Sequence, residues 1–170
     1  EIMEGMLREQ DGRCRALYLV NAHTLNEATD DPAYRDVLNS ADYVFNDGTG
    51  VRWAARQRGF ELRDNLCGTD LVPEFLTATS GHGYRYFLLG ADRNTIIGAA
   101  GYARARFPGW TLAGSHDGYV HADNSDAVVE QINAADVDLL LVGMGNPIQE
   151  QWILRNKSRL DVRLAIGVGG

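Results

Sequence analysis

The sequence is poor in cysteine and has no long hydrophobic run, and each scarcity excludes a class of protein. Only Cys14 and Cys67 occur among 170 residues, too few for a disulfide framework and typical of a reducing compartment. No stretch approaches the roughly 18–20 consecutive apolar residues that a transmembrane helix requires. No secretory signal pattern is present either. We therefore expect a globular protein without disulfides.

Basic residues are also scarce, because 16 lysines and arginines stand against 23 aspartates and glutamates, for a formal net charge of -7. A nucleic-acid-binding surface requires a basic face, so this charge argues against a nucleic-acid partner. It does not exclude a ligand that carries phosphate, since a few local cations or a helix N-terminus suffice to bind one. The length allows one domain with a sizeable core.

Short β-rich runs alternate with segments of helix length. We expect strands at residues 15–20, 42–45, 84–89, 137–142 and 163–168, with extended pieces at 110–113 and 119–120. We expect helices at residues 26–39, 49–58, 70–79, 94–107, 125–134 and 148–160. Such alternation produces right-handed βαβ units, and apolar runs such as LLLV are typical of strands covered on both faces. The sequence therefore predicts an α/β fold with a mostly parallel sheet and helices on both faces.

Asp47 follows the second expected strand, within the run Asn46-Asp47-Gly48-Thr49-Gly50. The glycines allow a ligand to approach the backbone closely. A carboxylate at such a turn can act as a general base if it reaches an acceptor hydroxyl. The alternative is that Asp47 caps the helix that begins at Thr49, and the spacing alone slightly favours this structural role.

Thr24 and Asn26 follow the first expected strand. Their side chains can hydrogen-bond a sugar or a pyrophosphate, and either residue can instead cap the following helix, which spacing alone favours. Polar residues at the ends of adjacent strands converge on one crevice in an open α/β sheet. We therefore expect Thr24, Asn26 and Asp47 to lie near one another.

The run GMGNPIQE, residues 143–150, joins a buried strand to a helix. Gly143 and Gly145 let the backbone approach a phosphate, and Pro147 suits the first helical turn. The N-terminus of that helix attracts anions, and we expect Gln149 and Glu150 to project from its first turn. The alternative is a tight turn without a ligand.

Other patterns are weaker. Gly90 ends a strand, and the nearby Asp92 either caps the next helix or contacts a ribose. Asp136 and Asp138 form the D-x-D pattern of many metal-dependent sugar transferases, but they open a buried strand, which favours a structural role. The four histidines lack zinc-site spacing, and the glycine fingerprint of dinucleotide-binding proteins is missing. We therefore predict neither a metal nor a cofactor.

The chain resembles the WecG/TagA/CpsF family of glycosyltransferases of bacterial surface-polysaccharide assembly. The matching runs are TLNE (24–27), LNSADYVFNDGTGV (38–51), GTDL (68–71), FLLGA (87–91) and GMGNPIQEQWI (143–153), in the family's order. The resemblance implies a Rossmann-like enzyme without a required metal. Such enzymes transfer a sugar with inversion from a UDP-sugar to a lipid-diphosphate-linked acceptor, commonly undecaprenyl-diphosphate-GlcNAc. N-acetylmannosamine, its uronic acid and a hexose are the implied donor sugars.

The resemblance also assigns residues. The family's catalytic aspartate falls on Asp47, its Thr-x-Asn pair on Thr24 and Asn26, and its loop glutamine on Gln149. Further candidate substrate-binding residues within the matching runs are Gly48, Asp70, Gly90, Gly143, Gly145, Pro147 and Glu150.

The chain departs from the family at three places. Asn46 stands where relatives commonly have proline, and Asn65 stands where many have arginine, with Arg63 the nearest cation. Relatives continue past the final GVGG into a basic, aromatic segment that is thought to close the active site and touch the membrane. We therefore expect residues 1–170 to form one glycosyltransferase domain that lacks this membrane-associating segment.

The implied location is cytoplasmic, peripheral at the inner face of the bacterial membrane. Whether copies associate as a homo-oligomer stays open. The alternatives from other functional classes are a nucleotide-cofactor oxidoreductase on the same fold and a non-catalytic nucleotide-binding scaffold.

Overall fold

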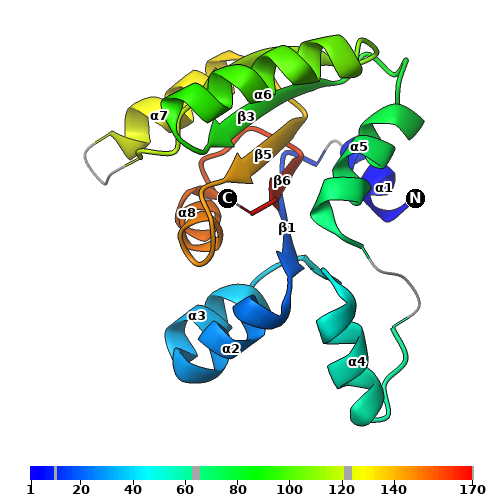
Figure 1. The fold of residues 1–170 in the computed structure, drawn as a ribbon. Coiled ribbons are helices and arrows are strands. Elements are labelled where there is room, and N and C mark those ends of the chain that lie inside the picture. The colour runs from blue at the N-terminus through cyan, green and yellow to red at the C-terminus, as the bar shows by residue number, and fades with distance from the viewer. Residues whose placement is uncertain (10, 63–65, 121–123, 170) are drawn as a thin grey trace.

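A computed structural model describes residues 1–9, 11–62, 66–120 and 124–169 (Figure 1). The helices are α1 Ile2–Arg8, α2 Ala22–Asp30, α3 Pro32–Asn39, α4 Thr49–Gln57, α5 Gly68–Ala78, α6 Arg93–Arg106, α7 Ser125–Ala134 and α8 Ile148–Asn156. The strands are β1 Arg15–Val20, β2 Tyr43–Asn46, β3 Arg85–Gly90, β4 Thr111–His116, β5 Leu139–Gly143 and β6 Leu164–Gly167. No helix within these ranges is long and apolar enough to span a bilayer.

The strands form one sheet in the order β2-β1-β6-β5-β3-β4, and every neighbouring pair is parallel. The predicted fold class, an α/β Rossmann-like arrangement with a parallel sheet, is therefore confirmed. Because all strands run the same way, their carboxyl ends share one edge of the sheet, here called the carboxyl edge. The opposite edge is called the amino edge.

Helices cover both faces of the sheet, and each face has its own apolar core. The first core joins the sheet to α3, α7 and α8 through residues such as Tyr34, Ile132 and Ile153. The second joins it to α1, α5 and α6 through residues such as Leu7 and Leu76. The connections that leave β3 and β5 run in opposite directions along the sheet and on opposite faces. Open α/β sheets bind ligands in the crevice at such a point.

The segment after β1 corrects the sequence prediction. The expected single helix at 26–39 is two helices, because Asp31 and Pro32 interrupt it and proline disfavours a helical residue before it. The Asp31 carboxylate accepts hydrogen bonds from the N–H groups of Ala33 (2.9 Å) and Tyr34 (3.2 Å) and so caps α3. The helix α2 begins at Ala22, four residues earlier than expected, so its N-cap residue is Asn21 rather than Thr24 or Asn26. Thr24 still takes part in the cap, because its side chain accepts a hydrogen bond from the Asn21 backbone N–H (3.4 Å).

Other boundaries differ at the ends of elements. The helix α1 was not predicted, and residues 119–120 lie outside any strand. The final helix, expected to reach residue 160, ends at Asn156. After it, the N–H of Arg159 donates a hydrogen bond to the Asn156 carbonyl (2.8 Å). The helix at 125–134 has the predicted bounds.

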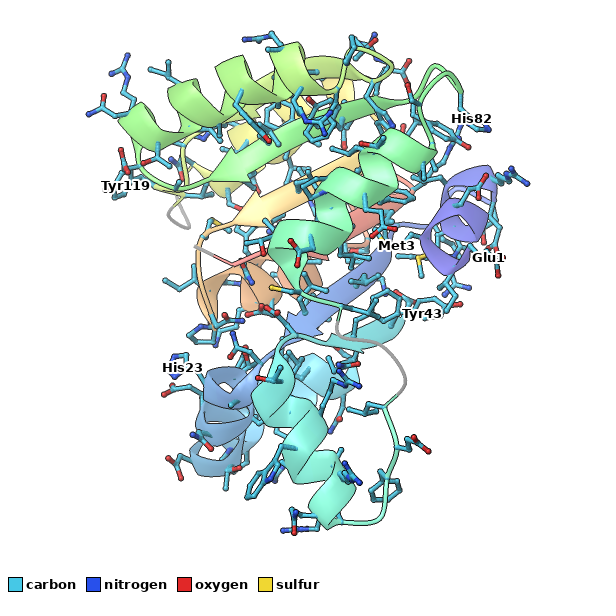
Figure 2. The ribbon with its side chains drawn as sticks, turned by 45° about the vertical axis from the view of Figure 1, so that its right-hand side comes forward. Glu1, Met3, His23, Tyr43, His82 and Tyr119 are labelled. Atoms are coloured by element: carbon cyan, nitrogen blue, oxygen red, sulfur yellow. The ribbon has the colours of Figure 1, made fainter. Side chains whose placement is uncertain are left out.

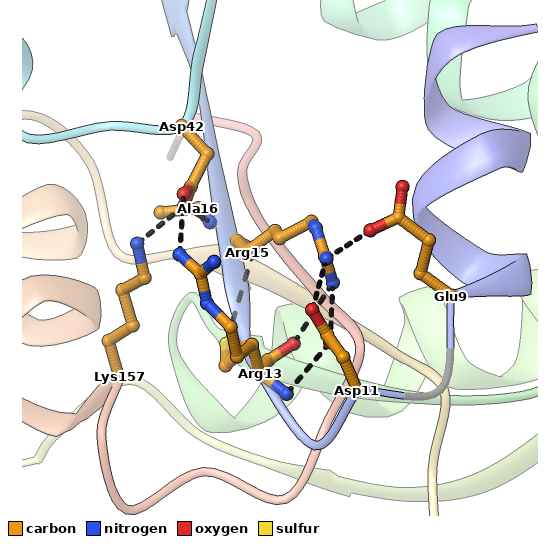
Figure 3. Close-up of polar contacts among 8 residues, drawn as sticks. Glu9, Asp11, Arg13, Arg15, Ala16, Asp42 and Lys157 are labelled. Atoms are coloured by element: carbon orange, nitrogen blue, oxygen red, sulfur yellow. Dashed lines mark hydrogen bonds and ion pairs between the residues drawn. The ribbon is translucent and has the colours of Figure 1, made fainter.

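Ion pairs and hydrogen bonds occupy the amino edge (Figure 3). The Arg15 guanidinium, at the start of β1, pairs with Asp11 (2.7 Å) and with Glu9. Asp42, just before β2, pairs with Lys157 and accepts a hydrogen bond from the backbone N–H of Ala16 (2.8 Å). These contacts hold the beginnings of β1 and β2 together.

Asp138, at the same edge, supports the structural interpretation of the D-x-D pattern. Its carboxylate accepts a hydrogen bond from the backbone N–H of Arg85 (2.9 Å) and pairs with Arg163 (3.1 Å). It therefore connects the beginnings of β3, β5 and β6.

Candidate active site

The carboxyl edge carries most of the residues that the sequence singles out. In Figure 2, His23, which follows β1, and Tyr119, which follows β4, mark this edge, whereas Tyr43 and His82 mark the opposite one. The backbone N–H of Asp47 donates to the carbonyl of Val20 (2.8 Å). The turn that carries Asp47 is therefore tied to the end of β1.

Asp47 is only partly buried, and its carboxylate has no hydrogen-bond or ion-pair partner among the residues that the structure describes. Gly48 caps α4 instead, with a φ of 94°, and no side chain contributes to that cap. The interpretation of Asp47 as a helix cap is therefore wrong. The φ of Gly48 lies in the region that favours glycine, and this turn leaves the Asp47 carboxylate free to meet a ligand.

Thr24 is completely buried, and its hydrogen bonds are used within the cap of α2. Its hydroxyl donates to the Asn21 side-chain oxygen (3.1 Å), and its backbone N–H donates to the same oxygen (3.0 Å). Asn26 lies on the exposed face of α2. The structure thus points the two candidate residues in different directions, with Asn21 between Thr24 and the end of β1.

Glu150 and Gln149 lie inside the protein rather than projecting from the first turn of α8, with 0% and 1% exposure. The Glu150 carboxylate accepts hydrogen bonds from the side-chain amides of Asn146 (2.7 Å) and Gln149 (2.7 Å) and from the Tyr34 hydroxyl (3.1 Å). Burial raises the pKa of Glu150, although these hydrogen bonds act in the opposite direction. This carboxylate organises the loop after β5 instead of facing solvent.

Gln149 connects the loops after β5 and β6. Its side-chain oxygen accepts a hydrogen bond from the backbone N–H of Gly169 (3.1 Å). A Cβ atom at Gly167 would lie 3.1 Å from the Gln149 side-chain nitrogen. The absence of a side chain at the end of β6 therefore makes room for Gln149.

Gly90 and Gly143 bring the ends of β3 and β5 into close approach. A Cβ atom on Gly90, whose φ is 132°, would lie 2.4 Å from the Gly143 carbonyl. The next residue, Ala91, has a φ of 60° and donates its N–H to the Gly143 carbonyl (2.7 Å). A left-handed conformation in a residue other than glycine is unfavourable and tends to occur at functional sites. The ends of β3 and β5 are therefore in close contact at the point where the connections that leave these two strands diverge.

A cavity of about 430 Å³ opens beside this junction, between Asp92, Tyr119, Met144 and the start of α8. The Asp92 carboxylate accepts hydrogen bonds from the N–H groups of Asn94 (2.9 Å) and Thr95 (3.1 Å). The capping role of Asp92 is therefore confirmed. The hydrogen bond from the Thr95 hydroxyl is the main reason that the pKa of Asp92 lies below its ordinary value.

A second, largely apolar cavity of about 470 Å³ lies on the other side of Gly90 and Gly143, between α5 and α6. Tyr86 lines it, and the buried Tyr86 hydroxyl has no hydrogen-bond partner within the described ranges. Sequence reasoning missed this hydroxyl and the roles of Tyr34 and Asn146. The contacts of Tyr34 could not be found from a local pattern, because its partners Glu150 and Asn146 lie more than 100 residues away in the chain.

The remaining candidate residues have simpler positions. Asp70 is exposed in the first turn of α5, and Pro147 precedes α8 as its cap. Gly145 has a φ of 79°, which favours glycine. Arg63 and Asn65, together with His121, lie outside the described residues. Among those that are described, no group of three histidine, cysteine or acidic residues could hold a metal.

An open parallel sheet with helices on both faces defines a protein of the Rossmann-like class, in which ligands bind at the carboxyl ends of the strands. A model of the glycosyl transferase WecG/TagA/CpsF family matches residues 1–170. The chain belongs to this family.

Relatives from Staphylococcus aureus strains NCTC 8325 / PS 47 and COL are each 35% identical to the chain over 157 residues. Each is named N-acetylglucosaminyldiphosphoundecaprenol N-acetyl-beta-D-mannosaminyltransferase. The match covers 91% of this chain and 61% of each relative. The chain thus spans about three fifths of the length of the curated relatives it matches.

Proposed function

We propose that the protein is an inverting glycosyltransferase that moves a sugar from a UDP-sugar to a polyprenyl-diphosphate-linked acceptor. The product would enter bacterial surface polysaccharide or teichoic acid. Family membership supports glycosyl transfer, and the names of the Staphylococcus aureus relatives support an undecaprenyl-diphosphate-linked acceptor. The observation that carries the proposal is the Asp47 carboxylate, which stands at the carboxyl edge with no partner among the described residues.

In the proposed reaction, Asp47 accepts the proton of the acceptor hydroxyl while the hydroxyl oxygen attacks the anomeric carbon of the donor sugar. The new glycosidic bond forms as the bond between that carbon and the UDP oxygen breaks, with inversion at the carbon. The electron pair leaves with the diphosphate. Asp47 afterwards releases its proton to water, which restores the carboxylate for the next turnover.

The leaving diphosphate needs stabilisation of its developing charge. The loop from Gly143 to Pro147 presents backbone at the N-terminus of α8, where aligned peptide dipoles favour an anion. The buried side chains of Glu150 and Gln149 hold this loop in place through their hydrogen bonds. Asn26 and Asp70 provide exposed polar groups that can bind the sugar. In this proposal, these residues orient the substrates for the reaction.

Asp47→Asn in the full-length protein tests the proposal, with a UDP-sugar donor and a short-chain lipid-diphosphate acceptor. A general base typically contributes 10²–10⁴-fold to a rate, so turnover should fall by about that factor while UDP affinity stays nearly unchanged. Wild-type turnover in the variant would refute the role of Asp47.

A donor panel tests the substrate assignment. UDP-N-acetylmannosamine should release UDP fastest in the presence of acceptor, and its uronic acid and UDP-glucose serve as comparisons. The UDP release should depend on acceptor. Tight binding of NAD without UDP binding would instead favour an oxidoreductase, and UDP binding without release across the panel would favour a scaffold.

A further inference from the structure

The helix α4 has no side chain buried in the protein. Figure 1 and Figure 2 both show it extending away from the sheet. The neighbouring α5, in contrast, buries Phe75 and Leu76 in one of the two cores. Packing of an apolar face normally supplies most of the stability of a helix in a protein. Most of the surface of α4 is therefore available for contact with another molecule, although Val51 and Ala55 are half-buried.

The exposed residues of α4 and the turn after it combine positive charge with large aromatic rings. Arg52, Arg56 and Arg58 are exposed, and Trp53 and Phe60 are each 68% exposed. No acidic residue occurs between Gly48 and Phe60, although the whole chain carries a formal charge of -7. The charge of this segment is thus opposite in sign to that of the protein.

The turn after α4 folds back to form a groove with the helix. The backbone N–H of Phe60 donates to the carbonyl of Ala55 (3.0 Å), and Arg52 Nε donates to the carbonyl of Leu62 (3.4 Å). The groove has a volume of about 590 Å³, and its lining includes Arg52, Trp53, Arg56 and Phe60 together with the acidic Glu61. Cationic and aromatic groups are therefore held together on one side of the molecule.

We propose that Thr49–Gln57 and the turn through residue 60, here called the α4 surface, docks on a membrane surface that contains anionic lipids. Arginine side chains near such a surface are attracted to its negative potential. Tryptophan is enriched at the level of the lipid headgroups, where an apolar ring and a polar N–H are both satisfied. The positive charge of the α4 surface is complementary to anionic lipid, whereas the rest of the chain is repelled.

The position of α4 gives this docking a consequence for catalysis, which rests on the proposed function. The helix begins two residues after Asp47. Docking through α4 would hold the Asp47 carboxylate close to the plane from which a lipid-linked diphosphate emerges. The docking itself does not depend on the reaction, so Asp47→Asn should bind vesicles as the wild type does.

Co-sedimentation with vesicles of equal parts phosphatidylglycerol and phosphatidylcholine tests the docking. The protein should bind these vesicles at low salt. It should not bind vesicles that contain only phosphatidylcholine. The double variant Arg52→Gln with Arg56→Gln should lower the partition coefficient about 30-fold, since each basic residue near the surface contributes about 1 kcal/mol. The control carries the same charge change on α6, with Arg93→Gln and Arg104→Gln, and should bind within about twofold of the wild type.

Tryptophan fluorescence gives a second readout that locates the contact. Trp110 and Trp152 are buried, with 4% and 3% exposure, so changes on binding report mainly on Trp53. Emission should shift to shorter wavelength on anionic vesicles and be quenched by brominated lipid, and both changes should be lost in Trp53→Phe.

Equal loss of binding in the α6 control, or vesicle binding without a change in Trp53 emission, would overturn the proposal. So would light scattering that shows a dimer which the Arg52→Gln, Arg56→Gln variant abolishes, because the α4 surface would then be an interface between two copies.

Discussion

Aspartates at the two edges of the sheet have different surroundings. At the amino edge, Asp42 and Asp138 each have a basic partner and a backbone N–H donor. At the carboxyl edge, Asp47 has no partner among the described residues, and the ends of β3 and β5 carry glycine. Neutralised charge stabilises the fold, whereas a partly exposed carboxylate without a described partner is available to a ligand. The comparison gives Asp42 and Asp138 a stabilising role and leaves Asp47 available for the proposed reaction.

The largest effect is expected from a substitution of Asp47, at the carboxyl edge. Asp47→Asn should lower turnover 10²–10⁴-fold, which corresponds to about 3–5 kcal/mol of transition-state stabilisation. Its free energy of unfolding should change by no more than about 0.5 kcal/mol, because the carboxylate has no described partner to lose. Urea denaturation beside the kinetic assay checks both, and a large loss of stability would show that Asp47 is structural.

Gly90→Ala should have the next largest effect. Its Cβ atom would lie 2.4 Å from the Gly143 carbonyl, so β3 and β5 would have to separate. A φ of 132° is also unfavourable for alanine. Because of both effects, we expect the free energy of unfolding to fall by about 3 kcal/mol. Gly98→Ala on α6 is the matched control: its Cβ atom meets nothing within 4 Å, and the helix should gain about 0.5–1 kcal/mol. Equal unfolding free energies for the two variants would contradict this reading of the junction.

At the amino edge, Asp42→Ala should lower the free energy of unfolding by about 2 kcal/mol. The substitution removes the charged acceptor of the Ala16 N–H and leaves Lys157 without its carboxylate partner. Activity per folded molecule should be retained. Asp126→Ala is the control, since its ion pair with Arg159 (2.7 Å) is exposed and should be worth less than about 0.5 kcal/mol.

The pH dependence of the Asp42→Ala effect has a definite sign. Burial acts to raise the pKa of Asp42, but hydrogen bonds from Lys157 and Ala16 outweigh it and hold the pKa below its ordinary value of 3.8. The stabilisation is therefore complete above pH 3.8 and is lost as the pH falls through the pKa of the folded state. The difference between wild type and variant should shrink in acid, and a difference that grows there would reverse the assignment.

Glu150→Gln should have the smallest effect, about 1 kcal/mol or less at neutral pH, because relief of a buried charge offsets a weaker hydrogen bond. Its sign with pH is opposite to that of Asp42. Burial raises the pKa of Glu150, so the folded state loses stability as the pH rises from the ordinary value of 4.5 through the raised pKa. This decline should be absent in Glu150→Gln, as chemical denaturation across that pH range would measure.

Local patterns in the sequence predicted much of the fold. Apolar runs such as 139–142 placed the strands within a few residues, and the alternation with helices predicted the parallel sheet. The break before Pro32 was missed, although the residue before a proline avoids helical conformation. The α1 helix was missed as well, because a short helix depends on packing against the sheet more than on its own sequence.

The candidate site was less predictable. The turn at Asp47 was visible as a polar residue after a strand, but the competing cap could be rejected only once the structure showed Gly48 as the cap of α4. The contacts of Glu150 could not be read locally, since Tyr34 lies 116 residues away. Hydrogen bonds between residues so distant depend on how the helices pack.

The bonds of Gln149 give the carboxyl edge a mechanical property. One end of its amide holds the backbone at Gly169, and the other end holds Glu150. Displacement of this side chain would therefore break both internal contacts at once, whereas the hydrogen bond from the Val168 N–H to the Val142 carbonyl (2.9 Å) would still hold the chain after β6.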